Sequence, residues 1–288
     1  MKRTVYVFIV SENGLLWERF LQGRRNQRAD LEGPFYVLGS PYRTLSPGKA
    51  VLASNEDFKE PANHPFVFTL QILSPSQQPL PNTTIDIWQA STVGEYYFKM
   101  YRLRGKCVTD ADGKVEILTV APGMYGPKGH ERAGHFHLKI SPPSTGIEGL
   151  TTQVYVCEGN NAKWLKTDFL NAIRKTRTQN ILRAYSVPPS SPTTSETEPY
   201  MSFPPLQSTT IPMSTSLSTQ ESDTDHNKKQ VDDHEKEEQK IKRLVESVKW
   251  WNEWLDEQCE EDAETTESRE DRLKVWACGE DVLELNYV

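Results

Sequence analysis

Two histidines stand two residues apart in the segment GHERAGHFHLKIS, residues 129–141. The end of this segment is typical of a β-strand, where side chains at positions i and i+2 point to the same face. We therefore predict that His135 and His137 project side by side. Such a pair can bind a metal ion, but paired histidines on a strand more often serve packing or hydrogen bonding. The pair alone leaves both interpretations open.

Tyrosines next to glycines occur in two segments upstream of the histidines. The first is DIWQASTVGEYYFKMYRLRG, residues 86–105, and the second is APGMYGPKG, residues 121–129. Phenolate is a hard anionic oxygen donor and imidazole a borderline nitrogen donor, so two of each suit a ferric ion. A zinc or copper site built from the histidines alone would leave both tyrosine segments without a role.

The composition limits the classes of function. The 288-residue chain has a net charge of -7, which gives it no electrostatic attraction to nucleic acid or to an anionic membrane. No apolar run approaches the roughly 20 residues that span a bilayer, and we interpret MKRTVYVFIV as a first strand rather than a secretory signal. The four scattered cysteines favour reduced thiols and a cytoplasmic location over a disulfide framework.

The elements that must position these residues are short strands separated by turns. Alternating or β-branched runs occupy residues 64–73, 83–90, 105–120, 134–141 and 151–159, and TDADGK at 109–114 has the Asp-Gly signature of a hairpin. Strands at this spacing predict a mainly β fold with short helices, built on an antiparallel β-sandwich. Residues 163–187 are typical of a helix followed by an extended piece.

The composition changes near residue 186. The next residues are rich in Ser, Thr and Pro and bury too little apolar area to offset the entropy of ordering, so we expect a disordered linker. The charged segment after it has apolar residues at helical spacing, which predicts an amphipathic helix that packs on its own domain or on a partner: Ile241, Leu244, Val245, Val248, Trp251 and Trp254 or Leu255. We divide the chain into an N-terminal strand or helix extension, the sandwich, the linker and the charged helical tail: residues 1–31, 32–186, 187–225 and 226–288.

Four segments together resemble a known family. PLPNTTIDIWQASTVGEYYF, LRGKCVTDADGKVEILTVAPGMYG, RAGHFHLKIS and LTTQVYVCEG occur in the order found in the intradiol ring-cleavage dioxygenases, and their wording is most similar to the catechol and hydroxyquinol branch. The preceding EGPFYVLGSPYR resembles fungal members of the family. The resemblance extends from about residue 32 to residue 159.

The resemblance implies a set of site residues. The tyrosine ligands of the family fall on Tyr96 and Tyr125, its histidine ligands on His135 and His137, its arginine on Arg132 and its glutamine on Gln153. Tyr97 is the rival of Tyr96, but the Gly-x-Tyr spacing selects Tyr96. Tyr101 has no motif support. The plainer alternative is that Arg132 is a surface arginine and Gln153 a sheet-edge amide; we favour the roles that the resemblance implies.

The resemblance also implies a chemistry. Family members hold non-haem Fe(III) and cleave a catechol-type ring between its two hydroxyl-bearing carbons with O2, which yields a muconate-type dicarboxylic acid. By analogy, Tyr125 is the phenolate that leaves when the substrate binds, Arg132 stabilises negative charge on the ring, and Gln153 hydrogen-bonds near the substrate. The expected partners are a catecholic substrate and O2, without nucleic acid or membrane; a homodimer or a helix-mediated protein partner stays open.

Departures from the family pattern motivate a second hypothesis. The sequence RAG lacks the proline that usually precedes the first histidine, and the stretches after Tyr96 and Tyr125 are short. No helical dimerisation segment is expected before residue 32. A non-catalytic β-sandwich that retains the scaffold as a binding or interaction module, with its C-terminal helix as the contact surface, fits these departures. Iron content and oxygen consumption distinguish this module from the enzyme.

Overall fold

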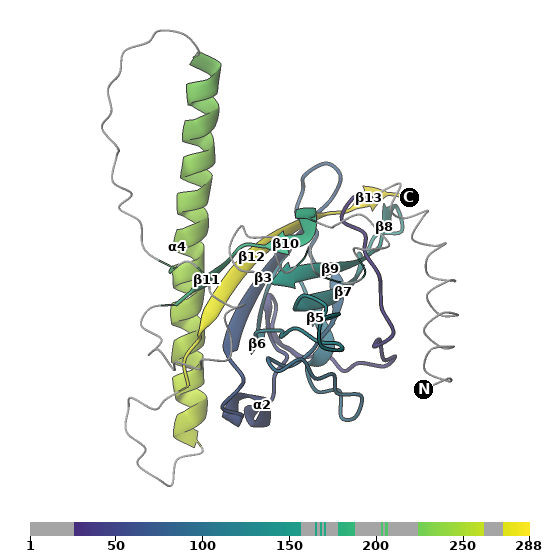
Figure 1. Cartoon of the computed structure of the whole chain (residues 1–288). Helices are drawn as coiled ribbons and strands as arrows, with labels where there is room; N and C mark the ends of the chain where they lie inside the picture. Colours follow the sequence, from purple (N-terminus) through teal and green to yellow (C-terminus); the bar gives the residue numbers. More distant parts are fainter. Residues whose placement is uncertain are drawn as a thin grey trace.

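Two stacked β-sheets make up most of the structure, a computed structural model that describes residues 26–156, 165, 168, 170, 178–187, 203, 205–206, 224–261 and 273–288 (Figure 1). The first sheet has six strands in the order β1 (Thr44–Ser46), β2 (Lys49–Val51), β6 (Lys114–Val120), β3 (Pro65–Leu73), β12 (Ala277–Glu284) and β11 (Ala184–Ser186). The second has five, in the order β10 (Ile181–Leu182), β9 (Leu150–Val156), β7 (His135–Ser141), β4 (Thr84–Gln89) and β5 (Arg104–Val108). A small third sheet pairs β13 (Asn286–Tyr287) with β8 (Ile147–Glu148). The helical elements in the described part of the chain are α2 (Asn55–Lys59), η2 (Thr178–Asn180) and α4 (Thr224–Glu261).

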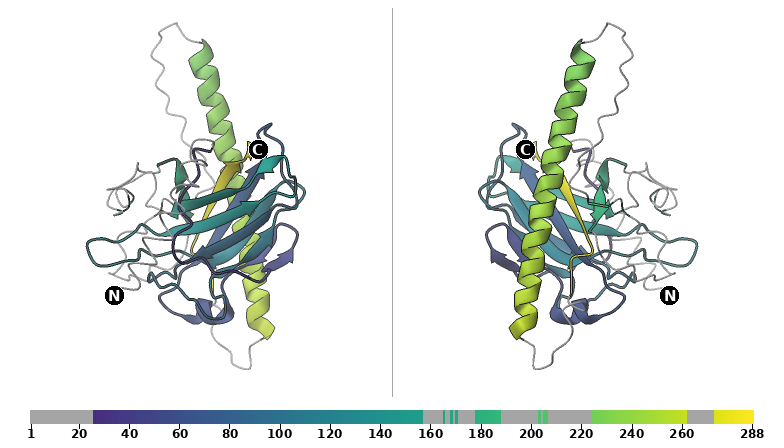
Figure 2. Two further views of the ribbon diagram at one scale, coloured as in Figure 1. Left: turned by 90° about the vertical axis from the view of Figure 1, so that its right-hand side faces the viewer. Right: turned by 90° about the vertical axis from the view of Figure 1, so that its left-hand side faces the viewer.

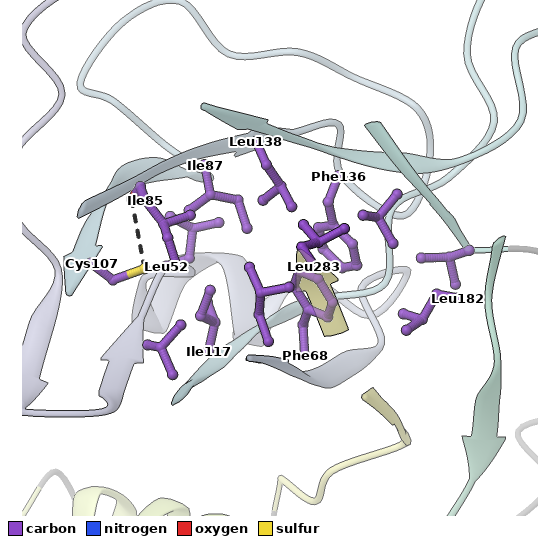
Figure 3. Packing of buried hydrophobic residues seen from close by; sticks show 14 of the residues in the cluster. Leu52, Phe68, Ile85, Ile87, Cys107, Ile117, Phe136, Leu138, Leu182 and Leu283 are labelled. Atoms are coloured by element: carbon purple, nitrogen blue, oxygen red, sulfur yellow. Dashed lines mark hydrogen bonds between the residues drawn. The ribbon is translucent and has the colours of Figure 1, made fainter. Parts of the chain in front are cut away.

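The main core lies between the two large sheets. Side chains that alternate along β3 and β7 point inward, and Phe68 stacks on Phe136 with ring centroids 4.6 Å apart (Figure 3). Ile85, Ile87 and Leu138 pack into the same cluster. Because alternate residues of a strand face opposite sides, Phe136 in the core requires His135 and His137 to lie on the outer face of the five-stranded sheet.

The mainly β prediction is confirmed, but the sheets are mixed rather than purely antiparallel. The neighbouring pairs β3/β6, β4/β5, β4/β7 and β7/β9 are antiparallel, whereas β2/β6, β3/β12 and β9/β10 are parallel. The strand β12, from the C-terminal end of the chain, inserts beside β3 along its whole length. We expected a helical tail there and did not predict this strand. Local turn signals cannot reveal such a distant partner.

The expected hairpin at TDADGK is wrong in one respect. The tight turn forms, with the amide of Asp110 donating to the carbonyl of Lys114 at 2.8 Å and Gly113 at a φ of +66°. The flanking strands do not pair, however, because β5 belongs to the five-stranded sheet and β6 to the six-stranded sheet. The turn therefore carries the chain from one layer of the sandwich to the other.

The helix α4 covers the outer face of the six-stranded sheet (Figure 2). Its buried residues Ile241, Leu244, Val248, Trp251 and Leu255 follow the predicted period and join a cluster with Val67, Leu118, Val120 and Cys278. Val245, which was placed on the apolar face, is 38 % exposed. Glu116 on β6 accepts hydrogen bonds from Ser247 at 2.6 Å and from the indole of Trp251 at 3.0 Å, which fix the helix on the sheet. Among the described residues, no helix combines the length and apolar character needed to cross a membrane.

Several predictions from the sequence lie outside the described residues. These are the first strand at residues 1–10, most of the helix expected in the first part of residues 163–187, and most of the linker at 187–225. The extended piece expected after that helix corresponds to β10 and β11. A pocket of about 290 Å³ lies between α4 and the six-stranded sheet, lined by Lys49, Glu116, Arg243, Trp250 and Glu280 among others. This pocket is on the opposite side of the molecule's core from the two histidines.

Truncation of Trp251 tests the packing of α4. Its side chain is fully buried, whereas the neighbouring Trp250 is 38 % exposed. We expect Trp251→Ala to lower the free energy of unfolding by about 3–5 kcal/mol and the matched control Trp250→Ala by less than about 1 kcal/mol. Denaturant unfolding followed by circular dichroism measures both. Equal effects of the two substitutions would contradict this seating of the helix.

Candidate metal centre

The candidate site lies on the outer face of the five-stranded sheet. His137 on β7 is directly opposite Trp88 on β4 and Gln153 on β9, and Trp88 is opposite Arg104 on β5. His135 is opposite Tyr155 in the next row. All of these side chains are at least 99 % buried, since the loops and the segment before β1 cover this face. The strands therefore place two imidazoles in a closed, water-poor environment.

The two imidazoles face each other through their Nε2 atoms, which are 3.0 Å apart. The Nδ1 of His135 lies 2.6 Å from the carbonyl oxygen of Ala133, which makes Nδ1 the protonated nitrogen and leaves Nε2 as an acceptor. His137 stacks on Trp88 with centroids 4.8 Å apart and an angle of 5°. The separation of the two Nε2 atoms fits a shared metal ion, because two nitrogens bound to one ion at about 2 Å and at a right angle lie about 3 Å apart.

Tyr96 and Tyr125 complete the site from two loops that touch through their backbones. The amide of Gly123 donates to the carbonyl of Ser91 at 2.9 Å, and a Cβ on Gly123 would lie 1.9 Å from the carbonyl oxygen of Thr92. Only glycine permits this approach. The glycines beside the two tyrosines therefore bring the loops after β4 and β6 together.

The four rings form a closed circuit. Centroid distances are 5.0 Å from Tyr96 to Tyr125, 5.5 Å from Tyr125 to His135, 4.6 Å from His135 to His137 and 6.2 Å from His137 back to Tyr96. The structure thus brings together all four side chains that the resemblance implied as ligands. Elsewhere among the described residues, no group of three or more His, Cys, Asp or Glu side chains is arranged to hold a metal ion.

The phenols fit a metal ion better than they fit a neutral pocket. Among the described residues, the buried hydroxyl of Tyr96 makes no hydrogen bond of normal geometry, and only the hydroxyl of Tyr125 acts on it as a weak partner. A buried hydroxyl in this position is unfavourable without a cation or another ligand. Burial raises the pKa of Tyr96 well above its usual value, and the neighbouring Tyr125 adds to the effect. Burial also raises the pKa of Tyr125, although Arg132 opposes it. A bound cation would reverse this balance and stabilise the phenolates.

Arg132 lies beside the circuit and is not a surface residue. It is 4 % exposed, and its Nη1 donates to the hydroxyl of Tyr125 at 3.1 Å. Its Nη2 donates to Oε1 of Gln153 at 2.8 Å and to the hydroxyl of Tyr155 at 3.1 Å. Gln153 is fully buried and is not a sheet-edge amide, since its Nε2 donates to the carbonyl of Leu31 at 2.6 Å.

The segment around residues 30–36 covers the site. Phe35 stacks on Tyr96 with centroids 4.4 Å apart and contacts Tyr125 edge-on at 5.8 Å. Gly33 has a φ of +75°, and a Cβ there would lie 3.1 Å from Cε1 of His137. A side chain at position 33 would therefore press on an imidazole of the circuit.

Both rejected tyrosines lie outside the circuit. The ring of Tyr97 packs against the guanidinium of Arg102 at 4.0 Å, and its hydroxyl donates to Glu95. The hydroxyl of Tyr101 donates to the carbonyl of Leu38. Sequence reasoning missed Phe35, Trp88, Arg104, Tyr155 and Asp168. Trp88 and Tyr155 lie on predicted strands, but the pairing that sets each opposite a histidine is known only from the structure.

Comparisons with known proteins assign the chain to a family. Residues 31–197 match the family described as Dioxygenase, and since this match covers more than half of the chain, the protein belongs to the intradiol ring-cleavage dioxygenases. The catechol 1,2-dioxygenase of Acinetobacter baylyi is 31 % identical over 147 residues, which are 44 % of this chain and 45 % of that protein. The chlorocatechol 1,2-dioxygenase of Pseudomonas sp. strain P51 is 29 % identical over 168 residues, 51 % of this chain and 61 % of that protein. The chain thus spans about half the length of these curated relatives.

The solved structures support the fold alone. The catechol 1,2-dioxygenase of Pseudomonas arvilla C-1 superposes with a TM-score of 0.54 at 17 % identity, covering 98 % of this chain and 71 % of that one. These relatives are bacterial, and the similarity of residues 32–43 to fungal members stays a prediction.

The orphaned phenol gives a test in the iron-free protein. At neutral pH we expect Tyr96→Phe to keep or raise the free energy of unfolding by up to about 2 kcal/mol, because a buried hydroxyl without a normal hydrogen bond is removed. The raised pKa adds a pH dependence. The stability that comes from the raised pKa of Tyr96 is fully present below the unfolded pKa of about 10. It is lost as pH rises through the higher folded-state pKa. Tyr96→Phe should therefore reduce the fall in the free energy of unfolding at alkaline pH.

Denaturant unfolding between about pH 7 and 11 measures both effects. Tyr42→Phe, at a side chain that is 64 % exposed, controls for the substitution itself. A loss of stability in Tyr96→Phe at neutral pH, together with an unchanged alkaline slope, would show that the Tyr96 hydroxyl is satisfied in the iron-free fold.

Proposed function

We propose that the protein is a non-haem Fe(III) intradiol dioxygenase. It cleaves a catechol-type aromatic between its two hydroxyl-bearing carbons with O2 and yields a muconate-type dicarboxylic acid. The observation that carries the proposal is the closed circuit of two phenols and two imidazoles, which includes a buried phenol without a hydrogen bond of normal geometry among the described residues. The relatives named catechol and chlorocatechol 1,2-dioxygenase support the substrate class.

Tyr96, Tyr125, His135 and His137 would hold the metal. Two hard phenolate oxygens and two imidazole nitrogens favour ferric over ferrous iron. When bound, Fe(III) supplies the Lewis acid and the redox partner through which a catechol reacts with dioxygen. No external reductant is needed.

Tyr125 has the properties of a phenolate that would give up the metal and take a proton when the substrate binds. Burial raises its pKa, so away from a cation its Oη is readily protonated. A catechol hydroxyl that is deprotonated on binding would supply this proton. The Nη1 of Arg132, at 3.1 Å, can keep its hydrogen bond to Oη in either protonation state, since a phenol oxygen also accepts.

Arg132 and Gln153 act on the substrate's charge and on its position. The guanidinium of Arg132 is permanently charged, and in a buried site it stabilises negative charge on the deprotonated ring. Both ends of the Gln153 amide are engaged, by Arg132 and by the carbonyl of Leu31. Gln153 therefore orients Arg132 and the covering segment. Phe35 and Trp88, which stack on Tyr96 and His137, supply apolar surface that excludes water from the bound substrate ring.

The alternative of a binding module loses two of its supports. The missing proline does not release the first histidine, because the carbonyl of Ala133 holds its Nδ1 and the amide of Val156 donates to the carbonyl of Gly134 at 2.9 Å. The apolar side of α4 covers the protein's own sheet, which leaves less of it for a partner. The enzyme is the better account of the site.

Iron retention tests the ligand set. We expect Tyr96→Phe and His137→Ala to bind iron more weakly by at least roughly 100-fold, because changes merely behind a metal ligand already weaken binding by about 10- to 100-fold. Metal analysis and the visible spectrum report it, since tyrosinate bound to Fe(III) gives a wine-red band. Tyr97→Phe, at the neighbouring ring outside the circuit, should stay red and fully loaded. A colourless loaded wild type would contradict the proposal.

Turnover with labelled oxygen tests the reaction. With catechol and ¹⁸O₂, we expect both labelled atoms in a ring-opened dicarboxylic acid. In a separate experiment under nitrogen, catechol should shift the red band of the iron-loaded protein to longer wavelength. Arg132→Gln should lower kcat by about 100- to 1,000-fold, as loss of one charge-stabilising donor does. A red, folded protein that consumes no oxygen with any catechol would favour the binding module instead.

A further inference from the structure

Arg132 forms an ion pair with Asp168, a carboxylate that no motif in the sequence singles out. The Nε of Arg132 lies 3.3 Å from Oδ1 and 3.2 Å from Oδ2 of Asp168, in WLKTDFL at residues 164–170. The side chains are 5 % and 0 % exposed. Oδ1 of Asp168 also accepts a hydrogen bond from the amide of Leu170 at 3.0 Å, which orients the carboxylate. The ion pair is therefore buried and has a defined geometry.

The position of this contact determines where the rest of the guanidinium points. A guanidinium is planar and its five N–H groups have fixed directions. Asp168 occupies the Nε edge, which leaves Nη1 for the hydroxyl of Tyr125 and Nη2 for Gln153 and Tyr155. A rotation of the plane that broke the contact with Asp168 would also misdirect the donor that meets Tyr125.

We propose that Asp168 is a positioning residue of the active site, which acts through Arg132 by holding its Nη1 toward the Tyr125 hydroxyl. The proposal rests on the proposed function and deepens it. Among the described residues, the carboxylate of Asp168 is hydrogen-bonded to Arg132 and to the amide of Leu170 and not to the four side chains of the circuit.

The negative charge of Asp168, and not only its shape, keeps the guanidinium of Arg132 in position. The other direct partners of the Arg132 side chain are the neutral hydroxyls of Tyr125 and Tyr155, the amide of Gln153 and the imidazole of His135. A second carboxylate, Asp30, acts on this cation from behind Tyr155, whose hydroxyl donates to it at 2.9 Å. Without Asp168 at the Nε edge, the phenolates and the deprotonated substrate would attract the guanidinium toward the circuit. The carboxylate of Asp168 counteracts this attraction, so that the guanidinium of Arg132 stays beside the circuit and does not move into it.

The first test uses the iron-free protein and needs no turnover. In ¹H–¹⁵N spectra of arginine side chains, the buried Nε–H of Arg132 should give a resolved signal, which Arg132→Gln identifies by its loss. Asp168→Asn keeps the size and one acceptor oxygen but removes the charge, and we expect the signal to shift or broaden. Asp281→Asn is the matched control, since it removes the negative charge of the Arg28–Asp281 pair, which is 2.5 Å apart and has no contact with the Arg132 side chain among the described hydrogen bonds.

The second test uses the iron-loaded protein. Asp168→Asn should bind iron as the wild type does, shift the tyrosinate band, and lower kcat about 10- to 100-fold with KM for catechol changed less than about threefold. Asp281→Asn should leave the band and kcat unchanged. In the Arg132→Gln background, adding Asp168→Asn should cost no further activity, because the residue through which Asp168 acts is gone.

The outcomes separate the two proposals. A wild-type protein that binds iron and cleaves catechol, with Asp168→Asn indistinguishable from Asp281→Asn, would overturn the role of Asp168 and leave the function intact. If Asp168→Asn does not fold, the double variant decides: a further loss of tenfold or more relative to Arg132→Gln would overturn the proposal, and equality supports it. A wild type that neither binds iron nor consumes oxygen would overturn both.

Discussion

The alternation of side chains along β7 is the constraint on which the rest of the structure depends. Phe136 and Leu138 fill the core between the sheets, while His135 and His137 enter the site on the other face. A shift of one residue in the pairing of β7 with β4 or β9 would exchange these two sets. The same pairing sets Gln153 and Trp88 opposite His137. Core packing thus determines the position of two proposed ligands, and the apolar stack of Phe136 on Phe68 fixes the register of the site.

A site on the outer face of a sheet must be covered before its polar groups can act in a dry environment. Here two segments provide the cover, one that precedes the strands in the sequence and one that follows β9. The segment that contains Asp30, Leu31 and Phe35 approaches from the N-terminal side, and Asp168 comes from beyond β9. Each brings a carboxylate or carbonyl oxygen for a group that burial would otherwise destabilise, namely Tyr155, Gln153 and Arg132. Burying Arg132 would be strongly unfavourable without such a counter-charge. Coverage and charge balance are therefore provided by the same segments.

Much of the site could be predicted from the sequence because its determinants are local. The spacing of His135 and His137 follows from strand geometry, and the glycines beside Tyr96 and Tyr125 mark loops that approach closely. Asp168 and Phe35 could not be found in this way, since nothing in their own neighbourhood signals a partner more than thirty residues away. The same limit explains the fold. The strands were recognisable one by one, but the parallel insertion of β12 and the crossing of the chain at TDADGK depend on contacts between distant segments.

The C-terminal residues affect the site through the core rather than through contact with it. The strand β3 has β6 on one side and β12 on the other, so the backbone groups along both of its edges are paired. Val67 on its outer face packs under α4, while Phe66 and Phe68 on its inner face meet Phe136. Loss of β12 and α4 would expose an edge strand and an apolar face, and it would loosen the layer against which β7 is packed. The tail is therefore part of what holds the two imidazoles in register, although it lies on the far side of the sandwich from them.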